Sequence, residues 1–561
     1  MKKFLLITLL LTSASLLFSQ TDWNLTWKMK DCPFRTPQEM SEMGIVKSGY
    51  DTDQDGKGEF LCAYTDKDSN FIMMFEAVAN DSFEMVWYWE YPIPANTFAG
   101  ITVGDMDNNG VVEIITTMPS VVGSDINPPR LWIFEWNGVN GENKYGDYGS
   151  GDCEPTAYWN FNVSDNYDFR PYSLIVEDID GDLVNELIVG VRQSQPSSRR
   201  EVLVASVSGI FTGFFTWNVE YNFQYVPGGS LYSVTTGDLD DDNKTEIYVL
   251  GWNYFNLRII ECNGDANYSV ETELDTVFYQ TGIDYGAVDG VRCADVNGDS
   301  VNELYIAGTE SPNQLFIITN ISDVGAITKN DIVPFYSIPK RTAEGGLKSM
   351  YIADPDLDGN LSLMIGGERN GQIFDLEYKG TGDPADSTNW ELTIAFDYWD
   401  ESGLPPDSFS APPRMFYGHP AGDMDGDGKE EYTFVNYATR FETWTGDAYV
   451  WVIEAEISTG IEDGQVITPK DIRLYQNYPN PFNPSTTIEY SIPSDMFVSV
   501  KVYNTLGQEI KTLVNESQNQ GRHIIEFKAS ELSSGIYFYT LTARSGTGQE
   551  IIQTKKMLLL K

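Results

Sequence analysis

The chain has 561 residues, which is too many for a single ordinary hydrophobic core. Several domains, or one large domain built from repeats, are therefore expected. Aromatic residues make up 13% of the chain and glycine and proline are frequent, a composition typical of many short strands and turns. The formal net charge of −47 argues strongly against nucleic acid or an anionic membrane as a partner.

The first twenty residues, MKKFLLITLLLTSASLLFSQ, have the pattern of a secretion signal peptide. Lys2 and Lys3 precede an apolar run over residues 4–11, small residues follow, and cleavage is expected near Ser19 or Gln20. A retained membrane anchor is the alternative, for which the apolar run is short. No later stretch is long enough to span a bilayer, so no transmembrane anchor is expected.

A nine-residue acidic pattern recurs seven times along the middle of the chain. Carboxylate or amide side chains stand at its first, third and fifth positions, and in six copies a glutamate stands at the ninth. The copies read DTDQDGKGE from Asp51, DMDNNGVVE from Asp105, DIDGDLVNE from Asp178, DLDDDNKTE from Asp238, DVNGDSVNE from Asp295, DPDLDGNLS from Asp354 and DMDGDGKEE from Asp423. Their starting points lie 54 to 73 residues apart, which indicates internal repeats rather than chance turns.

Each acidic segment lies between apolar runs that alternate in the manner of β-strands. A run such as YSLIV precedes it, a run such as ELIVGV follows it, and a third and an aromatic fourth run complete the repeat. Seven four-stranded units predict an all-β, seven-bladed β-propeller over residues 21–457. The stretch TDWNLTWKM resembles a fourth strand, and we expect it to complete the last unit. An eight-bladed ring or an open arc is the alternative.

The recurring acidic side chains have the chemistry of a calcium site. Calcium takes six to eight oxygen ligands, whereas closely spaced carboxylates without a cation repel one another. Aspartate and glycine also form ordinary turns, so a turn without metal is the alternative. The flanking runs are strands and the last acid stands at the ninth position, which distinguishes the pattern from an EF-hand.

These repeats resemble the FG-GAP/VCBS family, known from integrin α-subunit propellers and secreted bacterial proteins, over about residues 51–456. The resemblance implies up to seven Ca²⁺ ions. It implies carbonyl ligands at the seventh position, from Lys57, Val111, Val184, Lys244, Val301, Asn360 and Lys429. The implied side-chain ligands are Asp51, Asp53, Asp55, Glu59, Asp105, Asp107, Asn109, Glu113, Asp178, Asp180, Asp182, Glu186, Asp238, Asp240, Asp242, Glu246, Asp295, Asn297, Asp299, Glu303, Asp354, Asp356, Asp358, Asp423, Asp425, Asp427 and Glu431. Ser362 replaces the ninth-position acid, so the Asp354 site is expected to be the weakest or empty.

Two long insertions are the candidates for recognition, at residues 137–155 and 380–413. Loops on a rigid scaffold commonly carry binding residues. Their aromatic side chains are Tyr145, Tyr148, Trp390, Tyr398 and Trp399. These rings could stack on sugars, but we favour packing within a fourth strand for the three residues of the second insertion.

The sequence contains no linear catalytic motif, such as a nucleophile elbow, a zinc-protease helix or a phosphate loop, and no catalytic residue is assigned. His419, just before the seventh acidic loop, is expected to be packed or hydrogen-bonded rather than catalytic. The five cysteines are scattered, so no disulfide framework is expected. Cys262 and Cys293 are predicted to be buried thiols.

The sequence changes character after a polar linker at residues 458–470. Residues 471–561 carry nine basic and eight acidic side chains, and their alternating strands after the YPNPFNP stretch predict a small β-sandwich. YPNPFNP, VYNTLGQEI, LSSGIYFY and KKMLLLK closely resemble the type A sorting domain of the type IX secretion system. The resemblance implies export across the outer membrane of a Bacteroidetes-type bacterium by that machinery. An ordinary adhesive sandwich is the alternative.

Together these features predict a secreted or cell-surface calcium-binding propeller. We expect a non-catalytic binding or adhesion module whose ligand is a glycan or an extracellular protein. A polysaccharide-degrading lyase or hydrolase on the same scaffold is the first alternative, and a passive surface-layer component is the second.

Overall fold

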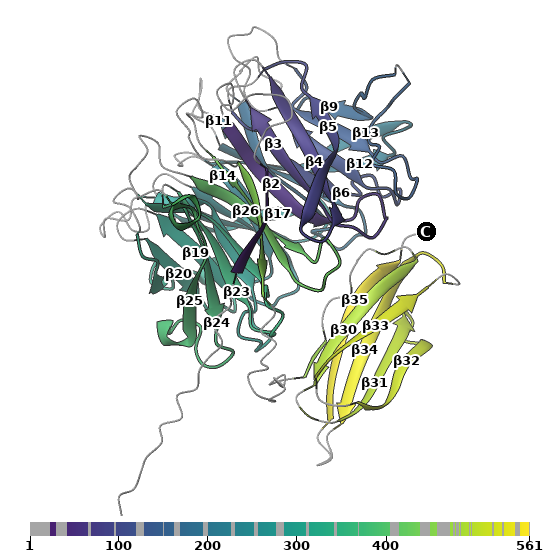
Figure 1. Ribbon diagram of the computed structural model, residues 1–561, viewed down its shortest axis with the longest axis vertical. Coiled ribbons are helices and arrows are strands. Elements are labelled where there is room, and N and C mark those ends of the chain that lie inside the picture. The colour runs from purple at the N-terminus through teal and green to yellow at the C-terminus, as the bar shows by residue number, and fades with distance from the viewer. Residues whose placement is uncertain are drawn as a thin grey trace, which may run out of the picture.

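The computed structural model shows an all-β protein with two separate sets of sheets (Figure 1). It describes residues 23–29, 42–65, 69–94, 97–118, 128–149, 151–161, 169–193, 200–225, 231–251, 256–275, 285–309, 313–340, 345–368, 370–403, 414–437, 449–456, 472–474, 477, 482, 484–492, 494, 496–518, 521–529, 532–544 and 550–559. The expected signal peptide and linker lie outside these residues. Helix is confined here to three short turns, η1 (Val324–Ala326), η2 (Ser387–Asn389) and α1 (Tyr398–Ser402). None of the described helices has the length and apolar character needed to cross a bilayer.

Residues 42–274 form four antiparallel sheets, each of four consecutive strands lying side by side in chain order. The first two sheets comprise β2 (Glu42–Tyr50), β3 (Glu59–Thr65), β4 (Asn70–Ala79) and β5 (Ser82–Glu90), then β6 (Ile101–Gly104), β7 (Glu113–Thr117), β8 (Leu131–Glu135) and β9 (Ala157–Trp159). The next two comprise β10 (Phe169–Glu177), β11 (Glu186–Gln193), β12 (Arg200–Gly209) and β13 (Phe215–Tyr225), then β14 (Leu231–Gly237), β15 (Glu246–Gly251), β16 (Asn256–Cys262) and β17 (Tyr268–Leu274).

Two further groups of four strands share one eight-stranded sheet, joined by a single parallel bridge between Asp289 and Ser349. Its strands are β18 (Tyr285–Ala294), β19 (Glu303–Thr309), β20 (Gln314–Ile318), β21 (Val333–Ser337), β22 (Gly346–Ala353), β23 (Ser362–Glu368), β24 (Gln372–Tyr378) and β25 (Trp390–Asp397). The last sheet of this set combines the N-terminal strand with three strands from the other end of residues 23–456. Its order is β26 (Met415–Gly422), β27 (Glu431–Asn436), β28 (Val450–Ala455) and β1 (Trp23–Met29). Pairing of β1 with β28 confirms the prediction that the N-terminal strand completes the last unit.

The acidic segments join the first and second strands of each group of four. In all seven, the ninth residue of the acidic segment pairs with the residue that immediately precedes the segment. Tyr50 pairs with Glu59 in the first copy, and Gly422 pairs with Glu431 in the seventh. The alternation of apolar and polar residues therefore predicted both the strands and the position of the loop between them.

The first strands of the seven groups contact one another in a closed circuit. β2 contacts β6, and the contacts continue through β10, β14, β18, β22 and β26 back to β2. Close approach depends on small residues at this contact. A Cβ atom on Gly104 would lie 2.7 Å from the Val176 side chain, and one on Gly237 would lie 2.6 Å from Cys293. The first and last groups of the chain segment are therefore direct neighbours.

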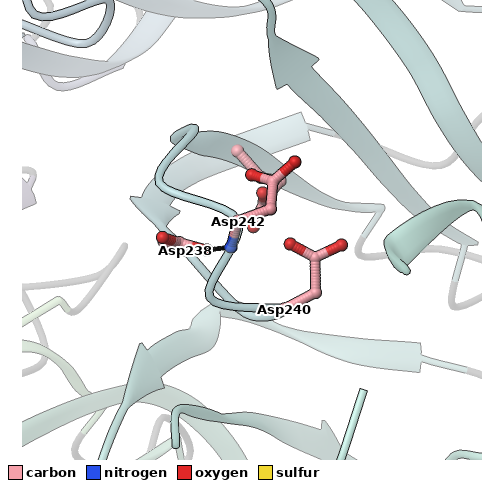
Figure 2. Close-up of side chains that lie close together, drawn as sticks. Asp238, Asp240 and Asp242 are labelled. Carbon is pink, nitrogen blue, oxygen red and sulfur yellow. Dashed lines mark hydrogen bonds between the residues drawn. The ribbon is translucent and has the colours of Figure 1, made fainter. Parts of the chain in front are cut away.

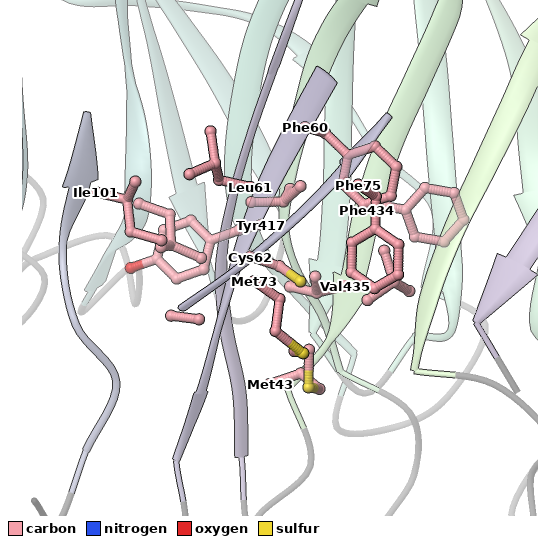
Figure 3. Close-up of a cluster of buried hydrophobic side chains, with 14 of the residues drawn as sticks. Met43, Phe60, Leu61, Cys62, Met73, Phe75, Ile101, Tyr417, Phe434 and Val435 are labelled. Carbon is pink, nitrogen blue, oxygen red and sulfur yellow. The ribbon is translucent and has the colours of Figure 1, made fainter. Parts of the chain in front are cut away.

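Apolar side chains fill the space between neighbouring sheets. The second strands β3, β7, β15 and β27 are buried along their whole length, because both of their faces are covered. Figure 3 shows side chains from the first and last sheets, among them Phe60, Phe75 and Phe434, gathered in one cluster. The ring of Trp27 on β1 lies 5.6–5.8 Å from those of Phe60, Phe75 and Phe83, so the N-terminal strand packs against the first sheet.

Residues 472–559 form a small β-sandwich with its own core. One sheet contains β29 (Arg473–Leu474), β30 (Ser485–Ile492) and β33 (Gly521–Lys528). The other contains, in spatial order, β32 (Glu509–Gln518), β31 (Met496–Asn504), β34 (Gly535–Arg544) and β35 (Glu550–Leu559). Buried side chains of both sheets, including Ile488, Phe527, Val500 and Leu541, form one hydrophobic cluster. The sequence predicted this second domain and its class.

Candidate metal centres

The seven acidic loops have one backbone conformation. In each loop the fourth and sixth residues adopt positive φ, a region that glycine enters without strain. Gly56 at the sixth position of the first loop has φ 87°, and the side-chain-bearing Leu183 at the same position of the third loop has φ 76°. Because a bulky residue rarely adopts this conformation, its presence at Leu183 shows that the surrounding loop imposes the turn.

Hydrogen bonds from the backbone hold the side chains of the first and fifth residues in place. The first-position aspartate accepts from the N–H group of the sixth residue in all seven loops, over 2.8–3.2 Å. The fifth-position side chain accepts from the N–H group of the seventh residue, over 2.7–3.0 Å. Each loop thus folds around its own carboxylate and amide oxygens, as Asx turns do.

The ninth-position glutamate is buried, and in several loops only one of its two carboxylate oxygens has a hydrogen-bond partner. In six loops its Oε2 atom accepts from the N–H group of the second loop residue, over 2.6–3.2 Å. In Glu59, Glu113, Glu246 and Glu431 the Oε1 atom is also buried and has no hydrogen-bond partner among the described residues. A buried carboxylate oxygen without a partner is costly, so these four atoms point to a ligand that a protein-only structure does not contain.

The acidic side chains converge within each loop. Asp238, Asp240, Asp242 and Glu246 each offer an oxygen within 4.8 Å of the others, and Figure 2 shows the three aspartates gathered around one tight turn. The same criterion holds for the sets Asp423, Asp425, Asp427 and Glu431; Asp51, Asp53 and Glu59; and Asp105, Asp107 and Glu113. Three or four oxygens at this separation match the hard-ligand environment that Ca²⁺ requires.

Burial and mutual repulsion raise the pKa values of four of these acids. Burial, followed by the charges of neighbouring aspartates, raises the pKa of Glu59 to about 9 and that of Glu113 to about 10. The same causes raise the pKa of Glu431 to about 9 and that of Asp53 to about 6. Glu59, Glu113 and Glu431 are therefore mostly protonated at neutral pH unless a cation offsets these effects. Their residues fit a divalent ion.

Sequence reasoning missed a second set of acids on the third strands. Strand register places Glu76 opposite Glu59, Glu135 opposite Glu113, Glu261 opposite Glu246 and Glu454 opposite Glu431. Glu76 offers an oxygen within 4.8 Å of Asp53 and Asp55. The repeated glutamate in MFEA, IFEWNG, IIECNG and VIEAE was the available signal, but only the pairing shows that it reaches the loop.

Lysine at the seventh position contacts these third-strand acids in three loops. Lys57 Nζ lies 2.7 Å from Asp55 and 3.1 Å from Glu76, and Lys244 Nζ lies 2.7 Å from Asp242 and 2.5 Å from Glu261. Lys429 pairs with Glu454 in the same way. The lysines neutralise part of the acidic charge in these loops. The carbonyl ligands expected at the seventh position remain a prediction.

The sixth loop differs, as its sequence indicates. Ser362 occupies the ninth position and supplies no carboxylate. The buried Asp375 of β24 instead accepts from Trp23 Nε1 over 3.1 Å. Burial raises the pKa of Asp375 to about 6, and the charge of Asp358 in the sixth loop contributes. A carboxyl group on the third strand thus lies within electrostatic reach of this loop.

Neighbouring loops are hydrogen-bonded to one another. Asn185 of the third loop donates to the Asp105 carbonyl of the second over 2.6 Å, and Asn302 of the fifth donates to the Asp238 carbonyl of the fourth over 2.5 Å. Gly58 of the first loop donates to the Met424 carbonyl of the seventh over 2.7 Å. A change in the conformation of one loop would therefore alter its hydrogen bonds to the loop of the adjacent sheet.

The aromatic residues of the two insertions are mostly buried. Tyr145, Trp390, Tyr398 and Trp399 have exposed fractions of 0–3%, so they are not free to stack on sugars and that hypothesis is wrong for them. Trp390 begins the fourth strand β25, as we favoured, whereas Tyr398 and Trp399 lie in the short helix α1. Tyr148 is half-buried, with Lys144 Nζ 5.1 Å from its ring centre.

His419 is hydrogen-bonded, as predicted. Its Nδ1 atom lies 2.8 Å from the Pro420 carbonyl and 3.2 Å from the Ser48 hydroxyl. Burial and the charge of Lys47 lower the pKa of His419 to about 3, so the ring is neutral at physiological pH. Cys262 is buried as predicted, but Cys293 is only half-buried.

A comparison with protein families identifies the C-terminal domain. Residues 476–556 match the family described as the secretion system C-terminal sorting domain. The C-terminal sandwich is therefore a type IX secretion sorting domain, and the protein is exported to the cell surface or the extracellular space. The comparison with curated proteins found no match to the chain.

Three solved structures similar to this chain each share 11% sequence identity with it. The extracellular domain of a protein described as a hybrid two-component system, from B. thetaiotaomicron, matches with a TM-score of 0.37 over 97% of this chain and 60% of its own length. The polysaccharide lyase Uly1 matches with a TM-score of 0.38 over 77% of this chain and 93% of its own. A lectin from Agrocybe aegerita, described as recognising non-reducing terminal N-acetylglucosamine, matches with a TM-score of 0.35 over 64% and 81%.

Proposed function

We propose that residues 23–456 are a seven-bladed β-propeller that holds Ca²⁺ in its first-to-second-strand loops and acts outside the cell as a binding module. The closed circuit of seven first strands supports a ring of seven blades over eight blades or an open arc. In this arrangement β1 completes the last blade, so the two ends of the ring are fastened by strand pairing.

The observation that carries the calcium proposal is the buried Oε1 atom left without a hydrogen-bond partner in Glu59, Glu113, Glu246 and Glu431. A bound divalent ion would supply that partner and relieve repulsion among the surrounding aspartates. Extracellular calcium modules have dissociation constants of roughly 0.1–1 mM. With calcium ten-fold above this value, each occupied site contributes about 1.4 kcal/mol to folding.

We propose that the rigid ring binds a glycan or an extracellular protein. Export by the sorting domain places the ring where such ligands occur, and the loops between its strands offer a large recognition surface. The direct test is incubation of the mature protein, in millimolar calcium, with a panel of polysaccharides and extracellular proteins. Retention of a panel member without cleavage supports the binding function. Absence of any retention contradicts it and favours a passive surface-layer component.

A polysaccharide-degrading enzyme is the second candidate. The observation that favours it is the proximity of groups able to transfer protons, since the rings of His419 and Tyr351 lie 4.9 Å apart. New chain ends in the same polysaccharide incubation support this candidate. Intact polysaccharides after prolonged incubation contradict it.

A further inference from the structure

A cluster of ionisable side chains lies where first strands of different sheets meet, and its members Lys47 and His419 each stand four residues before the first acid of a loop. Lys47 comes from β2, Asp289 and Arg292 from β18, Tyr351 from β22 and His419 from β26. Because β18 contacts β22, β22 contacts β26 and β26 contacts β2, these residues are brought together from across the sequence. No linear motif could have indicated this cluster.

Asp289 is the buried centre of the cluster. Its Oδ1 atom lies 2.9 Å from Arg292 Nη2 and accepts from the Ser233 hydroxyl over 2.6 Å, and its Oδ2 atom accepts from the Tyr351 hydroxyl over 2.6 Å. Burial alone would raise the pKa of Asp289, but Arg292, Lys47 and these hydrogen bonds hold it below its ordinary value. The carboxylate is therefore ionised, and its partners are in place.

The ring of Tyr351 is the common neighbour of the other groups. Arg292 Cζ lies 4.0 Å from the ring centre, Lys47 Nζ lies 5.8 Å from it, and the His419 ring centre lies 4.9 Å away. Lys47, Arg292, Tyr351 and His419 are all half-buried rather than fully enclosed. These four side chains are thus partly exposed to solvent.

The cluster has a net charge of about +1, because its two cations, Lys47 and Arg292, share one carboxylate, Asp289. Arg292 is paired with Asp289, whereas Lys47 Nζ makes no hydrogen bond or ion pair with any described residue. Burial lowers the pKa of Lys47 to about 8, and the charge of Arg292 contributes, while Asp289 opposes both. Lys47 is still mostly protonated at neutral pH, and His419 is neutral. A half-buried cation without a directly bonded counter-ion destabilises the folded protein. Binding of an anionic ligand would offset that cost.

We propose that this cluster binds one monoanionic group, a carboxylate or a sulfate ester, of an acidic saccharide, with Lys47 as the principal contact. The proposal rests on the proposed binding function and adds its site and ligand class. A phosphate monoester fits less well, because its charge of about −1.5 to −2 exceeds the single positive charge available. The half-buried rings of Tyr351 and His419 beside the cation suit a sugar, which presents both C–H and hydroxyl groups.

The acidic character of the whole protein does not oppose this site. Charges in solution are screened beyond a Debye length of about 8 Å at physiological ionic strength. An anionic group that has reached the cluster therefore interacts mainly with Lys47, Arg292 and Asp289, because four residues of extended strand, about 13 Å, separate Lys47 and His419 from the first acids of their loops.

The test is calorimetric titration of the full mature protein at fixed free calcium. The probes are a glucuronate-containing oligosaccharide, a sulfated oligosaccharide, an uncharged oligosaccharide of similar length, and acetate. We expect saturable binding of one or both charged oligosaccharides. Lys47→Met should weaken that binding roughly tenfold or more, because a charge-assisted hydrogen bond is lost. Lys47→Arg should retain most of it, and the exposed Lys329→Met should leave it unchanged.

Several results would overturn the proposal. Equal binding of acetate and the charged oligosaccharides would mean that no saccharide is recognised. Equal binding of the uncharged oligosaccharide, or undiminished binding by a folded Lys47→Met variant, would place the recognition site elsewhere on the ring and leave the proposed binding function intact. If no probe binds although the protein retains other ligands, the cluster is not a saccharide site; if nothing is retained at all, the binding function fails with it.

Discussion

At the scale of single residues, the ninth-position glutamates decide whether the loops are metal sites or only turns. Glu59 is fully buried, one of its oxygens accepts from Thr52 N–H over 2.7 Å, and the other has no partner among the described residues. Burial raises the pKa of this side chain to about 9, and a bound cation would favour its ionised form and use it as a ligand. The effect of a mutation at this residue therefore depends on calcium.

We predict that Glu59→Gln lowers the thermal midpoint in millimolar calcium and does not lower it in excess EDTA. In calcium the substitution removes a ligand and costs roughly 1–3 kcal/mol. In EDTA at neutral pH the raised pKa leaves Glu59 mostly protonated, so the isosteric amide replaces a neutral acid and the substitution is close to neutral. Thermal unfolding of both proteins in both buffers measures this, with the exposed Glu84→Gln as the control. Equal destabilisation in the two buffers would mean that Glu59 acts only through its hydrogen bond.

Lys47 provides a residue-scale test that depends on pH. Its pKa in the folded protein, about 8, lies below its ordinary value of 10.5, so the unfolded chain binds more protons between these values and stability rises with pH across that window. We predict that Lys47→Met raises the free energy of unfolding by about 1–3 kcal/mol at pH 7 and that this gain disappears near pH 10.5. Denaturant unfolding at several pH values measures the difference. A gain that is independent of pH would show that the lysine charge is not its cause.

The residues near Lys47 also show where sequence reasoning stops. Asp51 and Glu59 could be singled out as candidate ligands because both belong to one nine-residue pattern, and the structure brings their carboxylates within 4.8 Å of each other. Lys47 and Asp289 lie more than two hundred positions apart, and only the packing of first strands brings them together. The third-strand acids such as Glu76 were missed for the same reason, because strand register decides which residues face each other.

At the scale of elements, the strands were predictable and their pairing largely so. Alternating apolar residues and turn signals located the four strands of each repeat, and the short connections required antiparallel neighbours. The return of β1 to the last sheet was also anticipated, because Trp23–Met29 had a fourth-strand pattern without a unit of its own. The short helix α1 after β25 was not predicted, because its five residues lie in a segment that was expected to be loop and strand.

Closure by β1 predicts a large effect from one of its side chains. Trp27 contacts Phe60, Phe75 and Phe83 of the first sheet, so it joins the last sheet to the first. We predict that Trp27→Ala lowers the free energy of unfolding by about 2–4 kcal/mol, since truncation leaves a cavity among aromatic rings. Chemical denaturation measures the loss, and Trp27→Phe should recover much of it. A change below about 0.5 kcal/mol, typical of a surface site, would contradict a closing role for β1.

At the scale of the whole molecule, we expect the sorting domain and the preceding sheets to have distinct roles. The C-terminal sandwich has its own hydrophobic cluster and its match to the sorting family. We predict that a chain ending at residue 456 still crosses the inner membrane but stays in the periplasm. Cell fractionation with an antibody against the ring measures this, and the full chain in the same strain is the control. Normal export of the truncated chain would show that another segment directs secretion.

Calcium should matter to the ring and not to the sandwich. Six or seven occupied sites at about 1.4 kcal/mol each would add roughly 8–10 kcal/mol to the stability of the ring. For some 430 residues the entropy of unfolding is about 0.9 kcal/mol/K, so this corresponds to a shift on the order of 10 °C. The sorting domain has none of the acidic loops and should be indifferent to the ion.

The most direct measurement is differential scanning calorimetry of the full mature chain in millimolar calcium and again in excess EDTA. We predict two transitions, of which the larger, from the ring, falls by about 10 °C in EDTA while the smaller stays in place. A larger transition that does not move, in protein that contains no calcium, would show that the seven loops are turns and would contradict the account of this protein as a calcium-stabilised propeller.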